Sequence, residues 1–276
     1  MRIGEREFDF LTHTYVMGIM NVTPDSFSDG GKWGDSKAAI RHVEDMIHEG
    51  ADIIDVGGES TRPGYTGVSC EEELTRVIPM IRKIKLNFSI PVSIDTSKAK
   101  VARAAIEAGA DFVNEVTGLF GDPDMAFLIA EKKVPCCLMH NGLYIVKGNN
   151  CERRDIIKRL IQDFEMILEK ADKAGIERNK IILDPGIGFG KTYEENMTIL
   201  ANLDRLSCLG MPLLLGTSRK SVIGNTLGLS IEDRLEGSLV TSAIAAMNNF
   251  AFVRVHDVKE HVRSIQMTEE ISKWTI

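Results

Sequence analysis

Acidic and amide side chains interrupt the apolar runs of this sequence at widely separated points. Asp95, Asn114 and Asp184 each stand in or at the end of a short run of branched apolar residues. They offer hydrogen-bond acceptors and one amide, which suit the N–H edge of a flat heterocycle. Because such groups are costly to bury without a partner, they are candidates for a binding site.

Donor and cationic side chains form a second set. Asn21, Arg254 and His256 close two other apolar runs. Together with the backbone N–H groups of the loop after Asn21, they suit a phosphate group. Lys220 follows a further apolar run and could belong to either of the two sets of side chains. These residue types predict a ligand with a heterocyclic head and an anionic tail.

Eight short apolar runs must position these side chains. Between them, residues recur at three- and four-residue steps, which is typical of helices with one buried stripe. The six sets are Ile40, Val43 and Ile47; Leu74, Ile78 and Ile81; Val101, Ala105 and Ala108; Ile157, Leu160, Phe164 and Leu168; Met197, Leu200 and Leu203; and Leu239, Ser242 and Ala246. Near-continuous apolar strands indicate a parallel sheet covered on both faces. The runs span residues 15–22, 53–58, 91–96, 112–117, 135–140, 181–186, 212–218 and 252–258.

Eight strand–helix units in 276 residues favour an α/β fold of the (β/α)8 TIM-barrel type. An open doubly wound sheet is the alternative, but it would place a glycine-rich phosphate loop after its first strand, and "GIMNVTPDSF" is not one. The alternation in residues 6–14 predicts a short N-terminal hairpin that closes the bottom of the barrel. No linker interrupts the pattern, so we expect a single domain over residues 1–276.

Composition excludes several classes of protein. A net charge of −7 argues against a nucleic-acid or membrane-surface partner. No apolar stretch approaches the roughly 20 residues of a spanning helix, and the first residues lack a signal pattern. Five cysteines without C-x-x-C spacing predict reduced thiols. We therefore expect a cytoplasmic protein.

In a parallel barrel the active site lies where the strands end. In any protein, polar residues begin where strands end. For a single position, this structural explanation is therefore as good as a functional one. Polar groups at nearly all the strand ends together are harder to explain in that way. The strand-end residues are Asn21, Asp55, Glu59, Asp95, Asn114, Glu115, His140, Asp184, Ser218, Arg219, Lys220, Arg254 and His256.

Six segments carry a resemblance to a known family. They are "MGIMNVTPDSFSDGG", "DIIDVGGESTRPG", "SIDTSK", "ILDPGIGFGK", "LLGTSRKSVIG" and "FVRVHDV". In this order, over residues 17–258, they resemble the dihydropteroate synthases. The resemblance implies a TIM barrel, assisted by Mg²⁺, that condenses 6-hydroxymethyl-7,8-dihydropterin diphosphate with p-aminobenzoate. The products would be 7,8-dihydropteroate and pyrophosphate. It also implies a homodimer and a target of sulfonamide drugs, which compete with p-aminobenzoate.

The resemblance also implies site residues, position by position. The pterin would be bound by Asp95, Asn114, Met139, Asp184, Phe189 and Lys220. The diphosphate would be bound by Asn21, Arg62, Arg254 and His256, and Asn21 would also bind the metal. The p-aminobenzoate pocket would use Phe27, Thr61, Arg62, Pro63, Lys220 and Ser221.

Two departures from the family pattern concern neighbouring loops. Glu115 stands where the family commonly has Asp, and "MHNGLYIVKGNN" lacks the "MHMxGxP" form of many members. Met139 and His140 still match.

The chemistry expected of such a site is dissociative, because the pterin can carry positive charge as its bond to the diphosphate breaks. Asp95, Lys220, Arg254 and His256 are the candidate catalytic residues. Arg254 and His256 would stabilise the departing anion, while Asp95 holds the ring. The loop that follows Asn21 would close over the diphosphate as a lid.

Two rival functions remain open on the sequence. A methyltetrahydrofolate corrinoid methyltransferase would share the pterin-binding groups but expel no diphosphate, and the cationic strand ends speak against it. A catalytically silent pterin-binding homologue is disfavoured because Asn21, Arg62, Lys220, Arg254 and His256 are intact.

Overall fold

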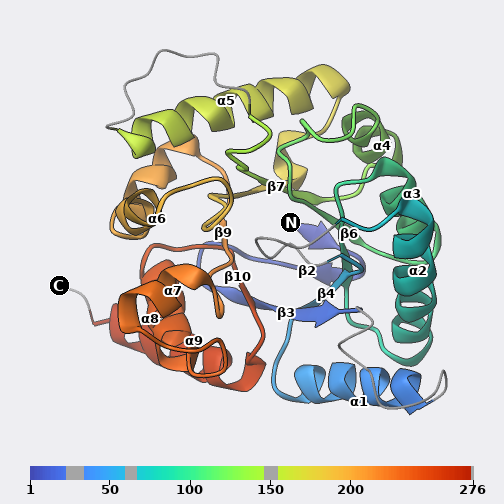
Figure 1. The fold of residues 1–276 in the computed structure, drawn as a ribbon, viewed down its shortest axis with the longest axis horizontal. Coiled ribbons are helices and arrows are strands. Elements are labelled where there is room, and N and C mark those ends of the chain that lie inside the picture. Colours follow the sequence, from blue (N-terminus) through green and yellow to red (C-terminus); the bar gives the residue numbers. More distant parts are fainter. Residues whose placement is uncertain (23–33, 60–66, 146–154, 275–276) are drawn as a thin grey trace.

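Eight parallel strands lie at the centre of the computed structural model, which describes residues 1–22, 34–59, 67–145 and 155–274 (Figure 1). Each lies within one of the eight apolar runs, which confirms the predicted strands. In chain order they are β3 (Tyr15–Asn21), β4 (Ile53–Gly57), β5 (Val92–Asp95), β6 (Phe112–Glu115), β7 (Cys136–Met139), β8 (Ile181–Asp184), β9 (Leu214–Leu215) and β10 (Phe252–Val255).

The sheet closes on itself. Its strand order is β8-β7-β6-β5-β4-β3-β10-β9, so β8 and β9 lie at the two ends of the hydrogen-bonded series. Leu183 of β8 forms a parallel bridge with Leu213, next to β9. The backbone N of Leu183 also donates to the carbonyl of Pro212 at 3.0 Å. The fold is therefore the predicted (β/α)8 barrel and not the open doubly wound sheet.

Both faces of the strands are apolar because both are covered. Alternate side chains point into the barrel and out toward the helices. The outward set joins the main core beneath the helices, as Ile54 and Val113 do. The inward set forms a separate cluster that includes Met17, Ile53, Phe112, Cys137, Ile182, Leu214 and Phe252.

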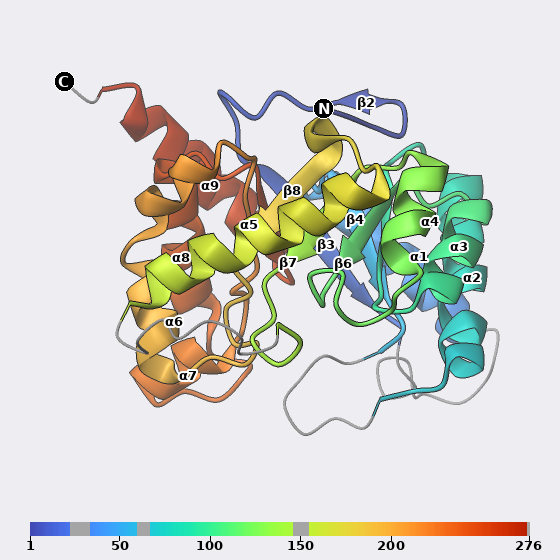
Figure 2. The same cartoon turned by 90° about the horizontal axis from the view of Figure 1, so that it is seen from above.

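An N-terminal hairpin closes the bottom of the barrel. Strands β1 (Arg2–Ile3) and β2 (Arg6–Glu7) pair antiparallel around Gly4, whose φ of 59° suits a tight turn. Ile3 and Phe8 are buried in the inner cluster, and the Phe8 ring lies 4.7 Å from Tyr15 between centroids. Figure 2 shows β2 at the end of the barrel opposite α7. The bounds predicted for the hairpin, 6–14, were wrong: the turn comes earlier, at the glycine.

Helices surround the strands (Figure 1). The predicted apolar stripes lie on α1, α2, α3, α5, α6 and α8, whereas α4, α7 and α9 were not predicted. No helix in the described ranges is both long and apolar enough to cross a membrane. The bounds are α1 (Gly34–His48), α2 (Cys70–Asn87), α3 (Ala99–Glu107), α4 (Met125–Lys132), α5 (Ile156–Ala174), α6 (Tyr193–Leu200), α7 (Ser221–Leu227), α8 (Leu235–Met247) and α9 (Val258–Ser272), with short 3₁₀ turns at Arg178–Lys180 and Leu203–Leu209.

Candidate active site

The acidic and amide residues predicted for the site lie at the carboxyl end of the barrel. Asp95, Met139 and Asp184 are the last residues of their strands, and Asn114 is the last but one of β6. All four are buried, with between 3% and 7% of their surface exposed. Because parallel strands all end on the same side, four segments far apart in sequence meet here.

Arg254 of β10 binds two of the buried carboxylates. Its Nε donates to Oδ2 of Asp55 at 2.5 Å, and its Nη2 donates to Oδ2 of Asp95 at 2.6 Å. Nδ2 of Asn114 donates to the same Asp55 oxygen at 3.1 Å. The other Asp55 oxygen, Oδ1, is buried without a hydrogen-bond partner among the described residues. A guanidinium held between two carboxylates thus forms the floor of the site.

Burial and charge set the protonation of this floor. Burial raises the pKa of Asp95 to about 7, with a smaller contribution from the neighbouring Asp55 carboxylate and against the opposing effect of the Arg254 guanidinium. Burial acts to lower the pKa of Arg254, but the Asp55 and Asp95 carboxylates outweigh it, so its pKa is raised. The arginine stays charged while Asp95 changes its charge near neutral pH.

Asp184 and Lys220 lie beside this cluster around Gly216. A Cβ built on Gly216 would lie 3.7 Å from Oδ2 of Asp184, 3.8 Å from Cβ of Arg254 and 3.9 Å from Nζ of Lys220. Burial raises the pKa of Asp184, and Lys220 opposes this. Burial also lowers the pKa of Lys220 to about 8, although the Asp184 carboxylate acts to raise it. The two groups therefore support each other's charged forms.

The 186–190 loop, which follows β8, fixes the position of Lys220. Its Nζ donates to the carbonyl of Ile187 at 2.6 Å. The same ammonium lies 4.5 Å from the centre of the Phe189 ring, within the range of a cation–π contact. Lys220 thus links the acidic floor to an aromatic wall.

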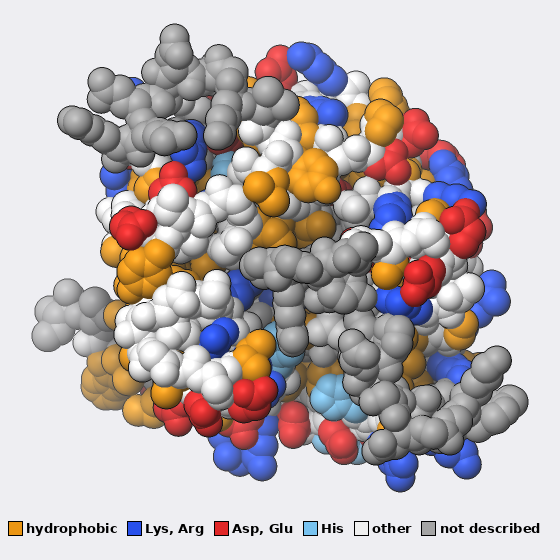
Figure 3. Space-filling view, in the orientation of Figure 1, with side chains coloured by type: hydrophobic (Ala, Val, Ile, Leu, Met, Phe, Trp, Pro, Cys, Tyr) orange, Lys and Arg blue, Asp and Glu red, His pale blue; other side chains and the backbone are white. Residues whose placement is uncertain are grey.

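A cavity of about 220 Å³ opens above these residues. Of the predicted site residues, Asn21, Phe189, Lys220, Ser221, Arg254 and His256 line it. Asp95, Asn114, Met139 and Asp184 do not line this cavity; they are buried at the ends of their strands. Figure 3 shows basic and histidine side chains at a hollow near the centre of this face.

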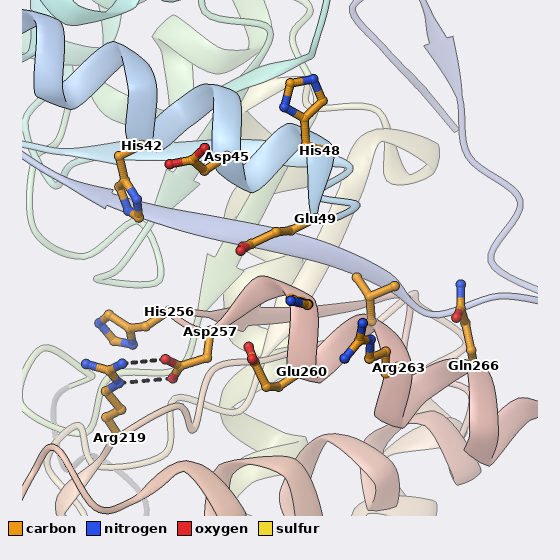
Figure 4. Close-up of a pocket in the computed structure, with 12 residues that line it drawn as sticks. His42, Asp45, His48, Glu49, Arg219, His256, Asp257, Glu260, Arg263 and Gln266 are labelled. Atoms are coloured by element: carbon orange, nitrogen blue, oxygen red, sulfur yellow. Dashed lines mark hydrogen bonds and ion pairs between the residues drawn. The ribbon is translucent and has the colours of Figure 1, made fainter.

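His256 and Arg219 form the rim between this cavity and a second one. The Ser218 hydroxyl lies 3.0 Å from Nδ1 of His256. Both guanidinium–carboxylate contacts of Arg219 go to Asp257, from its Nε at 3.0 Å and from its Nη2. The second cavity, about 710 Å³, lies in the groove between α1 and α9 (Figure 4). The ion pair thus fixes one side of the rim at the mouth.

The two departures from the family pattern have local structural roles. The Glu115 carboxylate accepts from the backbone N of Thr117 at 2.9 Å and of Leu119 at 2.6 Å. It is fully buried and stabilises the turn after β6. Nδ2 of Asn141 donates to the carbonyl of Val116 at 2.9 Å, which joins the loops after β6 and β7. Both side chains are occupied in holding loops.

Four predicted residues, Phe27, Thr61, Arg62 and Pro63, lie outside the described residues. The base of the second loop is described: Nζ of Lys98 donates to Glu59 at 2.5 Å and to the buried Glu73 at 2.6 Å. This network anchors the chain where it leaves β4.

Asp55 is the site residue whose role the sequence reasoning missed. It was identified as a strand-end carboxylate but given no catalytic role. The sequence feature that could have indicated its role is its place inside the apolar run "IIDVGG", where a carboxylate is costly to bury without a partner. Its partner Arg254 lies 199 residues away in the sequence, and the spacing of the two residues does not reveal that they meet.

The donor set at the mouth fits a magnesium ion only through phosphate. Among the described residues, no group of three or more His, Cys, Asp or Glu side chains is placed to hold a metal. Mg²⁺ commonly keeps several waters and binds through one or two protein oxygens plus substrate phosphates. The Asn21 amide, on the same wall as Arg254 and His256, offers one such oxygen.

Comparison with known proteins agrees with this geometry. The model of the "Pterin binding enzyme" family matches residues 17–256. The dihydropteroate synthase of Clostridium beijerinckii is 54% identical over 272 residues, covering 98% of this chain and 99% of that protein. That of Bacillus subtilis is 46% identical over 258 residues, covering 93% and 88%.

Solved structures give the same result. The dihydropteroate synthase of Clostridium difficile, determined in the presence of pteroic acid, has a TM-score of 0.90 and 48% identity, covering 96% of this chain and 99% of that one. The Xanthomonas albilineans enzyme with 4-aminobenzoic acid has a TM-score of 0.87 and 40% identity, covering 96% and 94%. On its sequence and its fold, the chain belongs to the pterin-binding enzyme family.

Proposed function

We propose that this protein acts as a dihydropteroate synthase, a transferase of the pterin-methyl group. It condenses 6-hydroxymethyl-7,8-dihydropterin diphosphate with p-aminobenzoate to give 7,8-dihydropteroate and pyrophosphate. The observation that carries the proposal is the junction of Arg254 with Asp95, beside Asp184 and Lys220, at one barrel mouth. Relatives of known structure have been determined with pteroic acid and with 7,8-dihydropteroate.

The acidic floor binds the pterin ring in this proposal. Carboxylates of Asp95 and Asp184 accept from the ring N–H groups, and the Asn114 amide reads a further edge. Met139 and Phe189 supply apolar walls. Lys220 completes the pocket, since its ammonium already lies over the Phe189 ring.

The basic wall binds the diphosphate. Arg254, His256 and Asn21 share one cavity, so their donors can meet the two phosphates together. Arg62 of the second loop adds a further cation. When bound, Mg²⁺ neutralises part of the charge that develops on the leaving group, and Asn21 holds it together with the phosphates.

The reaction exchanges one bond for another. The C–O bond between the pterin methylene and the diphosphate breaks, the C–N bond to the aromatic amine forms, and one proton is released. Asp95 and Asp184 stabilise positive charge on the ring, while Arg254 and His256 stabilise the anion that departs. Both charges develop within one enclosed mouth, so electrostatic stabilisation and positioning supply the rate.

The p-aminobenzoate pocket is formed by Lys220 and Ser221, at the start of α7, with Phe27, Thr61, Arg62 and Pro63 from the first two loops. Sulfonamides would compete for this pocket. The amine of p-aminobenzoate is the nucleophile, so no side chain needs to form a covalent bond.

We also propose a cytoplasmic homodimer. Among the residues that the structure describes, Cys70, Cys136, Cys137 and Cys208 form no disulfide with one another, which suits a reducing compartment. Exposed apolar residues recur on α8 and α9 and just after α9, namely Val240, Met247, Met267, Ile271 and Trp274. An apolar face of this kind suits a second copy of the chain. Light scattering of the wild type should give twice the mass of the monomer. Ile271→Glu should lower the measured mass to that of a single chain. A monomeric wild type would refute the dimer.

The proposed activity is tested by supplying pterin diphosphate, p-aminobenzoate and Mg²⁺ to the purified protein. Pyrophosphate and 7,8-dihydropteroate should appear in equal amounts. Binding of pterin diphosphate without release of pyrophosphate would instead identify a silent homologue. Methyl transfer from methyltetrahydrofolate to a corrinoid would identify the methyltransferase.

A further inference from the structure

Lys191 directly follows the 186–190 loop, and its side chain folds back onto the backbone of that loop. Its Nζ donates to three backbone carbonyls: Gly186 at 2.8 Å, His140 at 3.1 Å and Phe189 at 3.2 Å. An ammonium has three N–H donors, and a neutral amine has only two. The contact set therefore requires the protonated form and uses all of its donors on main-chain oxygens.

These carbonyls come from two loops that are pressed together. The backbone N of Gly142 donates to the carbonyl of Phe189 at 3.3 Å. A Cβ on Gly186 would lie 2.0 Å from the oxygen of His140, and one on Gly142 would lie 2.7 Å from the oxygen of Gly190. Converging carbonyl dipoles repel one another and are costly to bury unpaired. The Lys191 ammonium offsets that cost where the loops after β7 and β8 meet.

The 186–190 loop presents two groups to the proposed pterin pocket. The carbonyl of Ile187 accepts from Lys220 at 2.6 Å, and the Phe189 ring faces the same ammonium. Ile187, Gly188 and Phe189 also line the cavity of about 220 Å³. A shift of the loop would therefore move the aromatic wall and the acceptor of Lys220 together.

Lys191 also contributes charge to this region. Burial acts to lower the pKa of Lys191, and Lys220 and Arg159 on α5 act in the same direction, whereas Asp184 on β8 and Glu195 on α6 act to raise it. The three carbonyl acceptors favour the charged form as well. In return, the Lys191 charge acts to lower the pKa of Asp184 and of His140. Loss of the Lys191 charge would therefore raise the pKa of Asp184, in addition to changing the position of the loop.

We propose that Lys191 is a positioning residue for the pterin site: it fixes the 186–190 loop on the end of β7 so that Ile187 and Phe189 hold Lys220. This inference rests on the function proposed above. It assigns a role to a side chain that approaches the pocket only through the backbone it binds.

The experiment compares Lys191→Met, which keeps the length of the side chain but has no donor, with Lys191→Arg, which keeps the charge and donors. Lys180→Met is the matched control, because Nζ of Lys180 also donates to a loop carbonyl, that of Lys133, at 3.0 Å. Pterin diphosphate affinity is measured by calorimetry as a function of pH, and hydrogen exchange is followed in the peptide that covers residues 185–192.

Lys191→Met should weaken pterin binding by about tenfold and speed exchange in the loop. The acid limb of its affinity profile should move to higher pH, since Asp184 loses a neighbouring positive charge. Lys191→Arg should restore most of the affinity and the position of the limb, and Lys180→Met should match the wild type. If Lys191→Met unfolds, as judged by circular dichroism, Lys191→Gln provides the donor-poor variant.

Wild-type affinity together with an unmoved acid limb in a folded, donor-deficient variant would overturn the role of Lys191. So would a uniform loss of affinity that Lys191→Arg does not restore. If the wild type itself fails to bind pterin diphosphate, the proposed function fails; the exchange measurement, made without ligand, still decides whether Lys191 holds the loop.

Discussion

At the scale of single residues, the site depends on charges that are buried in pairs. Replacing one member of such a pair leaves the other unpaired in a poor solvent, which costs more than the pair itself contributes. Arg254 with Asp55 and Asp95 is the clearest example. Asp184 and Lys220 lie close together without a direct ion pair, and each favours the charged form of the other.

Asp184→Asn and Lys220→Ala should each weaken pterin binding by about a hundredfold while the barrel stays folded, since each removes a charged hydrogen-bonding group from the pocket. Titration calorimetry measures the affinity. Asp172→Asn is the control, because its carboxylate binds Arg178 on the protein surface, far from the mouth. Unchanged affinity in either test variant would remove that residue from the site.

Pterin affinity should be highest between pH 7 and pH 8, because the pKa of Asp95 is raised to about 7 and that of Lys220 is lowered to about 8. Below that window Asp95 gains a proton and loses its negative charge, while above it the Lys220 ammonium becomes neutral. Calorimetry across both limits tests this. Asp95→Asn should bind weakly and remove the part of the acid limb that comes from Asp95, leaving the part that comes from the buried Asp184. An acid limb of unchanged shape would assign all of it to Asp184.

The residue types at the strand ends were predictable, but their pairing was not. Asp95, Asp184 and Arg254 were predicted to meet because strands of a barrel end together. That Arg254 also binds Asp55 depends on the barrel's register, in which Arg254 pairs with Met17 and Asp55 with Ile19, and no local pattern encodes it. The assignment of each residue to a substrate stays a prediction.

At the scale of elements, short connections hold the loops around the mouth. Glu115 stabilises the turn after β6, Asn141 joins that turn to the next loop, and Lys191 joins that loop to the one after β8. The loops after β6, β7 and β8 therefore support one another at the mouth.

Glu115→Ala should lower the free energy of unfolding by roughly 2 to 4 kcal/mol, because the buried N–H groups of Thr117 and Leu119 would lose their acceptor. Urea denaturation measures the loss. Glu131→Ala is the control, since that carboxylate binds Arg103 on the surface and should have little effect. A similar small effect in both variants would contradict the structural role of Glu115.

The helices show where sequence patterns are informative. α5 has a regular stripe that includes Ile157, Leu160, Phe164 and Leu168, and its helix was predicted. α4 is short and apolar nearly all round, and α7 has only seven residues, so neither presents a periodic stripe to detect. α9 follows directly on "FVRVHDV", and its start was absorbed into the predicted strand.

At the scale of the whole molecule, the two ends of the barrel have separate tasks. The lower end is closed by apolar packing around Phe8, Tyr15 and Phe252, and the upper end carries the charged site. The single-domain reading over residues 1–276 stays a prediction.

Phe8→Ala should lower the free energy of unfolding by about 3 to 5 kcal/mol, because it empties a buried position beneath the barrel. Pterin affinity of the folded fraction should not change, since the hairpin lies at the far end (Figure 2). Thermal melting and calorimetry test the two statements separately. A loss of affinity in folded protein would mean that the two ends are coupled.

The bridge made by one guanidinium between Asp55 and Asp95 has a further consequence. A phosphate that approaches Arg254 would share this cation with Asp55 and with Asp95, which is proposed to bind the pterin ring. In the proposed complex, the pterin ring and the diphosphate would therefore both be recognised through the charge of Arg254, and binding of one would alter the electrostatic potential at the other. The affinities for the ring and for the diphosphate would then be coupled through Arg254.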